Sequence, residues 1–348
     1  MFEIKAIQAE NGDALLINYG GENDLRHILV DGGTADTTPI LLDILASSRR
    51  NGRLRLEALV ITHYDLDHID GVLGLLRNKP EWLDIDDIWF NGRKHLVAAD
   101  LLGAKEGDEL STLIDGHYSW NDKFGGKAIR IRPNSVELDG GMMVWVLSPD
   151  QQRLSALAAK WPVGKAMHPV EDGAIKSPDH LGKTETWPPG SFISMATTKF
   201  HEDSSVANGS SIALMLGYEG KLVLLAGDAF PSVMRSALNI HWPSQKPKIA
   251  LLKLSHHGSK ANTDSSFLNA IDCRRFLFST SGKNHRHPDF ASIARVLNSA
   301  HEPQMIFNYD QSQTTNWRTV PNGWPIYTTV FAEPDARFVA VDVTADLP

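Results

Sequence analysis

Apolar positions along this 348-residue chain follow two spacings, and together they predict a layered α/β protein. Runs of strand type end at turn residues and lie at 2–9, 14–20, 26–33, 54–62, 85–90, 140–149, 210–218, 221–229, 248–258, 274–282, 305–309, 326–331 and 337–343. Helical spacing of apolar residues predicts helices at 37–48, 69–76, 150–161 and 289–300. Because strands and helices alternate in two sets, the pattern favours an α/β sandwich.

The middle of the chain lacks a clear period. Residues 161–192 are rich in Pro, Gly, Ser and Lys, which is typical of a long surface segment. Strand-type runs resume after this segment, so we do not expect a linker between two domains. The sequence predicts one domain over residues 1–348, with an irregular, mobile insertion at about 161–205.

Composition limits the classes of function. Hydrophobic residues make up 42% of the chain and charged residues 22%, as in globular proteins with a core. The net charge of −8 gives no general attraction to nucleic acid or to an anionic membrane, so a polyanion would need a local patch or bound metal. The single cysteine, Cys273, excludes an internal disulfide, and we expect it in the core. With no signal-peptide pattern and no apolar run of roughly eighteen residues, we expect a cytoplasmic protein without membrane contact.

Candidate chemistry gathers where four strand-type runs end. The segments are "HYDLDH" at 63–68, "GD" at 227–228, "SHHGS" at 255–259 and "NHRHP" at 284–288. Three of them hold six of the 14 histidines. Rigid scaffolds often hold metal ligands in loops just past strand ends, and converging carboxylates repel one another unless a cation lies between them. The pattern therefore predicts a metal site rather than a structural hydrogen-bond network.

The segment His63-x-Asp65-x-Asp67-His68, followed by Ile-x-Gly, resembles the signature of the metallo-β-lactamase superfamily, with Asp65 where a histidine is usual. Further segments resemble the hydrolase domain of ComEC-type competence proteins: "GDALLI", "ILVDGG", "NGSSIALML", "LLAGD", "LKLSHHGS" and "NHRHP". They run from residue 12 to 288 in the family's order, whereas residues 93–200 and the C-terminal sixth do not match. The membrane segments of the competence proteins have no counterpart here, so DNA import is not carried over.

The resemblance implies an αββα four-layer sandwich with two divalent metal ions, Zn or Mn, at the shared end of two sheets. The implied metal ligands are His63, Asp65, Asp67, His68, Asn208, Asp228 and one of the pair His256 and His257. Asp228 matches the aspartate that commonly bridges both metals, and Asn208 stands where many members have a histidine. Asp65 and Asn208 offer oxygen in place of nitrogen, which shifts the preference from Zn²⁺ toward Mn²⁺ or Mg²⁺ without deciding between Zn and Mn.

The reaction that follows is hydrolysis by a metal-bound hydroxide. The catalytic candidates are Asp67, Asp228, His257 and His287: an aspartate would orient the nucleophile, and His287 or the non-ligating histidine of the pair would protonate the leaving oxygen. The substrate-binding candidates are Ser259, Lys260, Asn284, Arg286 and His287. Together with Lys283, the basic residues beside the motifs suit an anionic substrate.

Three functions stay open. A phosphodiesterase or nuclease acting on DNA or RNA is favoured by the resemblance and by the local cations. A hydrolase of a small anionic ester, such as a cyclic nucleotide or a phosphorylated metabolite, fits the negative net charge of the chain better. A regulatory or binding subunit that keeps the fold could dock a protein partner through the 161–192 segment. The sequence leaves the oligomeric state open.

Overall fold

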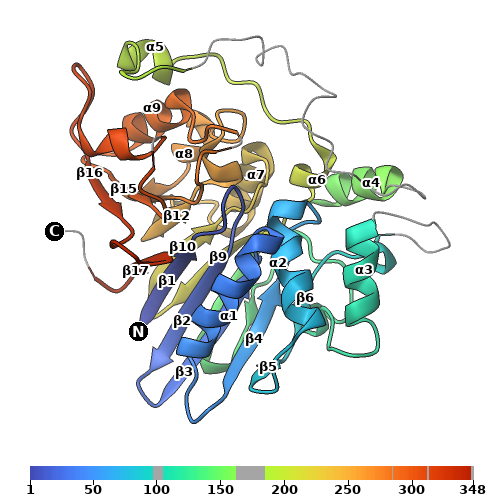
Figure 1. The fold of residues 1–348 in the computed structure, drawn as a ribbon. Helices are drawn as coiled ribbons and strands as arrows, with labels where there is room; N and C mark the ends of the chain where they lie inside the picture. Colours follow the sequence, from blue (N-terminus) through green and yellow to red (C-terminus); the bar gives the residue numbers. More distant parts are fainter. Residues whose placement is uncertain (97–104, 162–184, 284, 312, 346–348) are drawn as a thin grey trace.

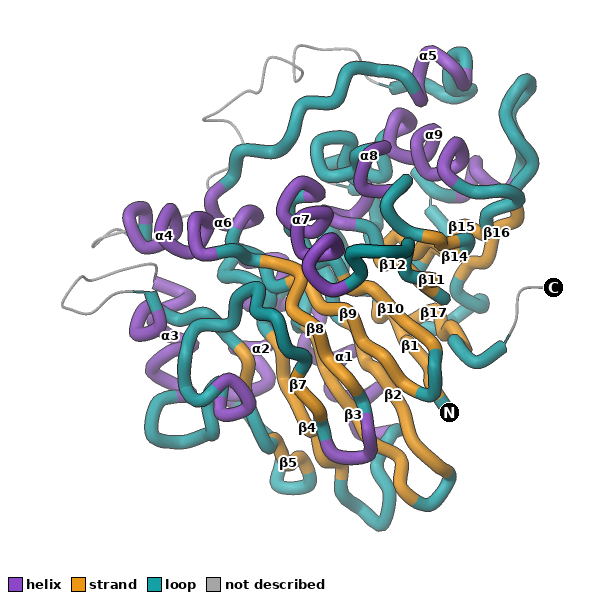
Figure 2. Tube along the Cα trace, turned by 180° about the vertical axis from the view of Figure 1, so that it is seen from behind, coloured by secondary structure: helices purple, strands orange, loops and turns teal. Residues whose placement is uncertain are grey.

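Two mixed β-sheets lie face to face, and helices cover the outer side of each (Figure 1). The computed structural model describes residues 1–96, 105–161, 185–283, 285–311 and 313–345. Seen from behind, the strands of the second sheet lie in front of those of the first (Figure 2). The predicted α/β class and its αββα layers are confirmed.

The first sheet combines the N-terminal strands with the last strand of the chain. Its order is β17-β1-β2-β3-β4-β5, and β6 pairs with β4. The strands are β1 (Phe2–Ile7), β2 (Leu15–Gly21), β3 (Asp24–Val30), β4 (Leu54–Val60), β5 (Leu83–Ile85), β6 (Ile88–Trp89) and β17 (Phe338–Asp342). Its outer face packs against α1 (Thr38–Ser47), α2 (Leu66–Arg77) and α3 (Lys105–Ile114).

The second sheet has the order β16-β15-β14-β12-β10-β9-β8-β7. Its strands are β7 (Val136–Glu137), β8 (Met143–Ser148), β9 (Ala213–Tyr218), β10 (Lys221–Leu225), β12 (Leu251–Lys253), β14 (Arg275–Phe278), β15 (Gln304–Phe307) and β16 (Thr328–Phe331). Its outer face packs against α7 (Pro231–His241), α8 (Ser265–Leu268) and α9 (Phe290–Ser299), while α4 (Gln151–Lys160) and α6 (Val206–Gly209) lie together beside it. The strands β10, β12, β14 and β15 run parallel, so their carboxyl ends share one edge.

The central core lies between the two sheets. In β2, Leu15 and Ile17 pack toward the second sheet, whereas Leu16 packs toward the helices over the first sheet. Because both faces of the strand are covered, residues 15–17 are all apolar instead of alternating with polar residues. None of the helices in the described part of the chain combines the length and apolar character needed to cross a membrane.

The predicted strand 248–258 is wrong in its extent. It divides into β11 (Lys248–Ile249), which pairs with β13 (Asp272–Cys273) in a separate two-stranded sheet, and β12 in the main sheet. Residues 255–258 form a tight turn in which His256 and His257 have φ angles of 47° and 56°. Such left-handed backbone cannot continue a strand, so the strand ends before the two histidines.

The predicted irregular insertion is only partly irregular. Its residues 162–184 lie outside the described residues, but α5 (Phe192–Ala196) packs beside α9. The Trp187 ring meets Trp317 edge to face, with 5.1 Å between centroids, and Phe192 meets Trp324 at 5.4 Å. The polar composition of the segment hides Trp187 and Phe192, which are partly buried and hold the segment against the second helical layer.

Candidate metal centre

Four loops that follow strands meet at one end of the two sheets. The loop after β4 carries residues 62–68, and the loops after β10, β12 and β14 carry residues 226–229, 254–259 and 279–289. The last three strands are parallel neighbours, so their loops lie side by side. The Ile212 amide, just before β9, donates to the Thr62 carbonyl at 2.9 Å and connects the loop of the first sheet to the second sheet.

One group of ligand atoms forms around His63, His68 and Asp228, all of which are buried. One ligand atom from each lies within 4.8 Å of the others. The His68 Nε2 atom is 3.5 Å from Asp228 Oδ2, and the His63 Nε2 atom is 3.9 Å from the same oxygen. Asp65 Oδ2 lies 3.5 Å from His63 Nε2, so Asp65 stands beside this group.

A second group forms around Asp67, His68 and His257 within the same limit of 4.8 Å. The His257 Nε2 atom is 3.7 Å from Asp67 Oδ2 and 3.8 Å from Asp228 Oδ1. Asp228 thus turns one oxygen toward His63 and His68 and the other toward His257. It lies between the two groups, where a carboxylate could contact two ions at once.

Hydrogen bonds at Nδ1 fix the three histidine rings. The Nδ1 atom of His257 lies 2.8 Å from the Ser279 carbonyl, which can only accept, so this nitrogen is the donor. The Nδ1 of His68 lies 2.8 Å from Asp31 Oδ2, and that of His63 lies 3.0 Å from the Thr62 hydroxyl. With Nδ1 occupied, each ring turns Nε2 into the cluster, as outer hydrogen-bond partners do for metal-binding histidines.

The cluster leaves buried polar atoms unsatisfied. Within the described residues, the Nε2 atoms of His63, His68 and His257 and the Oδ1 atom of Asp228 are buried without a hydrogen-bond partner. An unpaired buried polar atom costs about 1–3 kcal/mol, and native proteins rarely keep several in one place. Imidazole nitrogens and carboxylate oxygens that converge in this way form a donor set suited to divalent transition metals.

Charges in the cluster shift its pKa values strongly. Burial alone would raise the pKa of Asp228, but His68, His256 and His257 lower it well below its usual range. Burial alone would lower the pKa of His68, but Asp228, Asp31 and Asp67 raise it well above its usual range. Without a metal, a proton is therefore held on His68, and a metal ion would have to displace it.

His256 and Asn208 lie beside the first group of ligand atoms. The side chain of His256 is 27% exposed, and its Nε2 is 3.8 Å from Asp228 Oδ2. Its Nδ1 meets Asn262 Oδ1 at 3.0 Å. The Asn208 amide donates to Asp203 Oδ2 at 2.7 Å and lies 3.5 Å from His256 Nδ1. The sequence could not choose between the paired histidines. His257 belongs to the buried cluster, whereas His256 is at its more exposed side.

The predicted substrate-binding residues are placed unequally. The ring of His287 lies 5.5 Å from that of His256, and burial lowers its pKa. Arg286 is exposed, and Lys260 is half-buried with its backbone amide bonded to Asp289. Ser259 is buried, and its hydroxyl accepts from the Ala261 amide at 3.2 Å, which fixes the local turn. Asn284 lies outside the described residues.

Sequence reasoning missed two buried aspartates at this end of the protein. Asp31 accepts from the Thr62 amide and hydroxyl, each at 2.8 Å, as well as from His68. Asp13 lies next to His257 and pairs with Lys253. Asp31 stands in the "ILVDGG" segment, directly after an apolar strand, and Asp13 stands in the "GDALLI" segment, directly before one. Their position at strand ends was the available signal.

The fold and the cluster define this chain as an αββα protein with a candidate metal centre. A family model described as the metallo-beta-lactamase superfamily matches residues 9–81, a stretch that contains Asp13, Asp31 and the whole 63–68 motif. Over this stretch, which carries three of the five residues in the two groups of ligand atoms, the chain is similar to the metallo-beta-lactamase superfamily. No curated protein sequence matches the chain.

Solved structures also match the chain, and the two described here have low sequence identity to it. Zn²⁺-bound PqqB from Methylobacterium extorquens is 10% identical, with 98% of this chain and 100% of that chain covered and a TM-score of 0.44. A mutant of the CmlA beta-hydroxylase is 9% identical, with coverage of 98% and 53% and a TM-score of 0.39. The chain spans about half the length of that hydroxylase. These likenesses assign no activity.

Proposed function

We propose that this protein is a metal-dependent hydrolase that acts on phosphodiester bonds. The observation that carries the proposal is the convergence of the buried, unpaired Nε2 and Oδ1 atoms at the shared end of the two sheets. His63, Asp65 and Asp228, with Asn208 nearby, would hold one divalent ion. Asp67, His68 and His257, with Asp228 shared, would hold a second. Such ions polarise a phosphoryl oxygen and lower the pKa of water, which supplies a nucleophile at neutral pH.

Residues of the chain supply the proton chemistry in this proposal. The His287 ring lies beside His256, and its Nδ1 is 3.5 Å from Asp289 Oδ2, which orients it. From there His287 would donate a proton to the leaving oxygen. Asp67, which accepts from the Asn11 amide at 3.3 Å, would orient the attacking water. The metal identity stays between Zn and Mn, because Asp65 and Asn208 add oxygen to a site rich in histidine.

The preference for phosphodiesters is supported by the resemblance to ComEC-type hydrolase domains and by Lys260, Lys283 and Arg286 near the cluster. One observation favours a second candidate, the hydrolase of a small anionic ester. Lys283 forms an ion pair with Glu10 at 3.1 Å, which reduces the cationic surface that a nucleic-acid strand would meet. Together with the net charge of −8, this pairing suits a small substrate.

The test begins with metal content measured by mass spectrometry on protein purified without chelators. The same samples are assayed on bis-p-nitrophenyl phosphate, single- and double-stranded DNA and a cyclic nucleotide, with added Mn²⁺ or Zn²⁺. The control is Asp67→Ala combined with Asp228→Ala. About two ions per chain, with turnover lost in the variant, is the expected result. Turnover of the cyclic nucleotide alone would select the second candidate. If the chain shows no metal uptake and no turnover, the catalytic proposal is overturned and a binding subunit is favoured.

A further inference from the structure

A buried ion pair lies directly behind the candidate metal centre. Lys253, the last residue of β12, is 0% exposed, and Asp13, in the loop after β1, is 1% exposed. The Lys253 Nζ atom makes a salt bridge to Asp13 Oδ2 and donates to the Gly227 carbonyl at 3.2 Å. Burying two charges costs several kcal/mol per ion, and apolar pairs of similar volume are often equally stable. Stability alone therefore does not explain this pair.

The pair contacts two of the loops that carry metal-ligand candidates. Asp13 turns its second oxygen, Oδ1, toward His257, whose Nδ1 is 3.5 Å away. That oxygen is buried and has no hydrogen-bond partner among the described residues. Gly227, which accepts from Lys253, directly precedes Asp228. The ion pair thus holds the backbone beside Asp228 and sets a carboxylate behind His257.

The loop that carries Asp13 also contacts the loop of residues 62–68, which holds Asp67. The side-chain amide of Asn11 (Nδ2) donates to Asp67 Oδ2 at 3.3 Å. A Cβ atom at Gly12 would stand 1.6 Å from the Asp67 carbonyl oxygen, so the two backbones touch. The Ser279 hydroxyl donates to the Gly12 carbonyl at 3.3 Å, and the Ser279 carbonyl receives Nδ1 of His257. Residues 11–13 therefore contact Asp67 directly and lie against Ser279 and His257. Through Lys253 they are also linked to the Gly227 carbonyl, which precedes Asp228.

We propose that Asp13 and Lys253 are positioning residues for the ion that Asp67, His68, His257 and Asp228 would hold. This inference rests on the proposed function. Lys253 fixes Asp13 and the Gly227 carbonyl relative to each other. Asp13 places a negative charge 3.5 Å from Nδ1 of His257, the nitrogen that donates to the Ser279 carbonyl and leaves Nε2 facing the cluster. Outer partners of this kind change metal affinity by about 10–100-fold when they are removed.

The test separates positioning from stability by replacing both charges at once. Asp13→Leu combined with Lys253→Met removes the pair without leaving a lone buried charge, so the metal-free chain keeps its thermal unfolding midpoint to within a few degrees, on the order expected for a neutral replacement. Affinity for Zn²⁺ and Mn²⁺ is measured on the metal-free chain by competition with a chelating dye. We expect one of two ions to bind about 10–100-fold more weakly. The matched control, Arg53→Met with Asp84→Leu, removes an exposed pair on the first sheet and leaves both readouts unchanged.

Each result has a definite meaning. Unchanged metal affinity in a folded double variant would overturn the positioning role while leaving the proposed function intact. Absence of metal uptake by the unaltered chain would overturn both. If the double variant does not fold, Asp13→Asn combined with Lys253→Met supplies the measurement, because it keeps the side-chain shape at position 13 and leaves no lone buried charge. Weaker metal binding by that folded variant supports the inference, and unchanged binding overturns it.

Discussion

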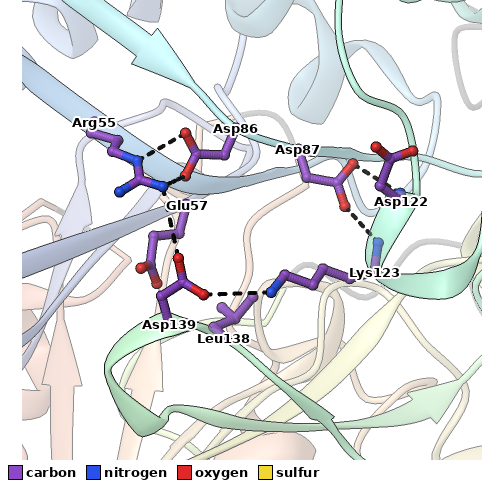
Figure 3. Close-up of a pocket in the computed structure, with 8 residues that line it drawn as sticks. All are labelled: Arg55, Glu57, Asp86, Asp87, Asp122, Lys123, Leu138 and Asp139. Carbon is purple, nitrogen blue, oxygen red and sulfur yellow. Dashed lines mark hydrogen bonds and ion pairs between the residues drawn. The ribbon is translucent and has the colours of Figure 1, made fainter.

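Carboxylates gather at two places along β4, one at its beginning and one in the loop that follows it. The loop leads into the candidate metal centre through His63. At the beginning of the strand, a cavity of about 310 Å³ is lined by Arg55, Glu57, Asp86, Asp87, Asp122, Lys123, Leu138 and Asp139 (Figure 3). We call it the acidic pocket. By charge alone the two places look similar, because each brings several aspartates together.

Four of the five carboxylates that line the acidic pocket, those of Glu57, Asp86, Asp87 and Asp139, already have partners within the protein. Asp86 pairs with Arg55 at 2.7 Å, and Asp139 lies 3.7 Å from both Arg55 and Lys123. Asp87 accepts from the Trp89 ring at 2.8 Å and from two backbone amides at 3.1 Å. Glu57 pairs with Tyr19 and Arg26. These bonds use the acceptor atoms that a cation would need.

The metal centre differs in the pairing of its ligand atoms. Nε2 of His63, His68 and His257 and Oδ1 of Asp228 find no hydrogen-bond partner in the described part of the chain. The ring nitrogens also supply a ligand type that the acidic pocket lacks, since no histidine lines that pocket. Unsatisfied donor atoms of suitable chemistry, and not the density of negative charge, therefore distinguish the candidate site.

The largest effect should come from breaking the metal centre at its shared residue. Asp228→Ala removes the carboxylate that lies between both groups of ligand atoms. We expect loss of bound metal and a fall in phosphodiester turnover of roughly 10³-fold or more. Metal analysis and single-time-point assays measure both. Asp86→Ala in the acidic pocket is the matched control and should keep both readings. Equal losses in the two variants would remove the distinction between the two places.

A smaller effect should follow from disturbing the loop behind the centre. Gly12→Ala forces a methyl group against the Asp67 backbone, where the Cβ would stand 1.6 Å from the carbonyl oxygen. We expect a loss of about 1–3 kcal/mol in the free energy of unfolding, as for other overpacked sites, together with weaker metal binding. Urea unfolding measures the first quantity. Gly21→Ala has open space around the new methyl group and is the control. A Gly12→Ala variant as stable as the control would contradict the close backbone contact.

The pH dependence of stability should distinguish metal-free from metal-loaded protein. The pKa values of His68 and His256 are raised in the folded chain, so their protonation stabilises it fully below pH 6.5. This contribution is lost as the pH rises through the folded pKa values, with a slope of up to about 1.4 kcal/mol per pH unit for each proton. Asp228 has a lowered pKa, so its contribution is lost only in acid.

Bound metal should reduce the alkaline part of this slope, because the ion replaces the proton on His68 and its positive charge disfavours the proton on His256. Urea unfolding at several pH values between 6 and 9, with EDTA or with metal, checks the difference. His68→Gln should flatten the metal-free curve, since it removes one of the raised groups. A metal-free chain whose stability rises steadily over this range would show that the histidines are not held in the protonated state by Asp228 and its neighbours.

The candidate residues of the metal centre are easier to find in the sequence than those of the acidic pocket, for a physical reason. The ligand candidates follow apolar strands directly, as His63 follows β4 and His256 follows β12, so a local pattern reveals them. The fold class also follows from local periodicity. The split of β11 from β12 could not be read in this way, because it depends on which neighbouring strand each half pairs with.

Asp13 and Lys253 are a contact that local sequence patterns do not predict. They are 240 positions apart, and only the packing of the two sheets brings them together. Asp13 stands in the "GDALLI" segment and Lys253 in the "LKLSHHGS" segment, but nothing in either segment indicates that the two side chains pair. The acidic pocket is similar, since it combines residues of β4 with those near 86, 122 and 139. Side chains that satisfy one another across the fold carry little signal in the sequence.

The smallest effect should come from the acidic pocket itself. Asp139 is 57% exposed and lies 3.7 Å from both Arg55 and Lys123, so its ion pairs are screened by water. We expect Asp139→Ala to change the free energy of unfolding by less than about 1 kcal/mol, the usual range for exposed pairs. Added Mn²⁺ or Zn²⁺ should stabilise this variant as much as the unaltered chain, because the atoms that would bind the ions are elsewhere. If Asp139→Ala instead removed part of the metal-induced rise in melting temperature, the acidic pocket would be a second cation site. In that case the pairing of its carboxylates would not exclude cations.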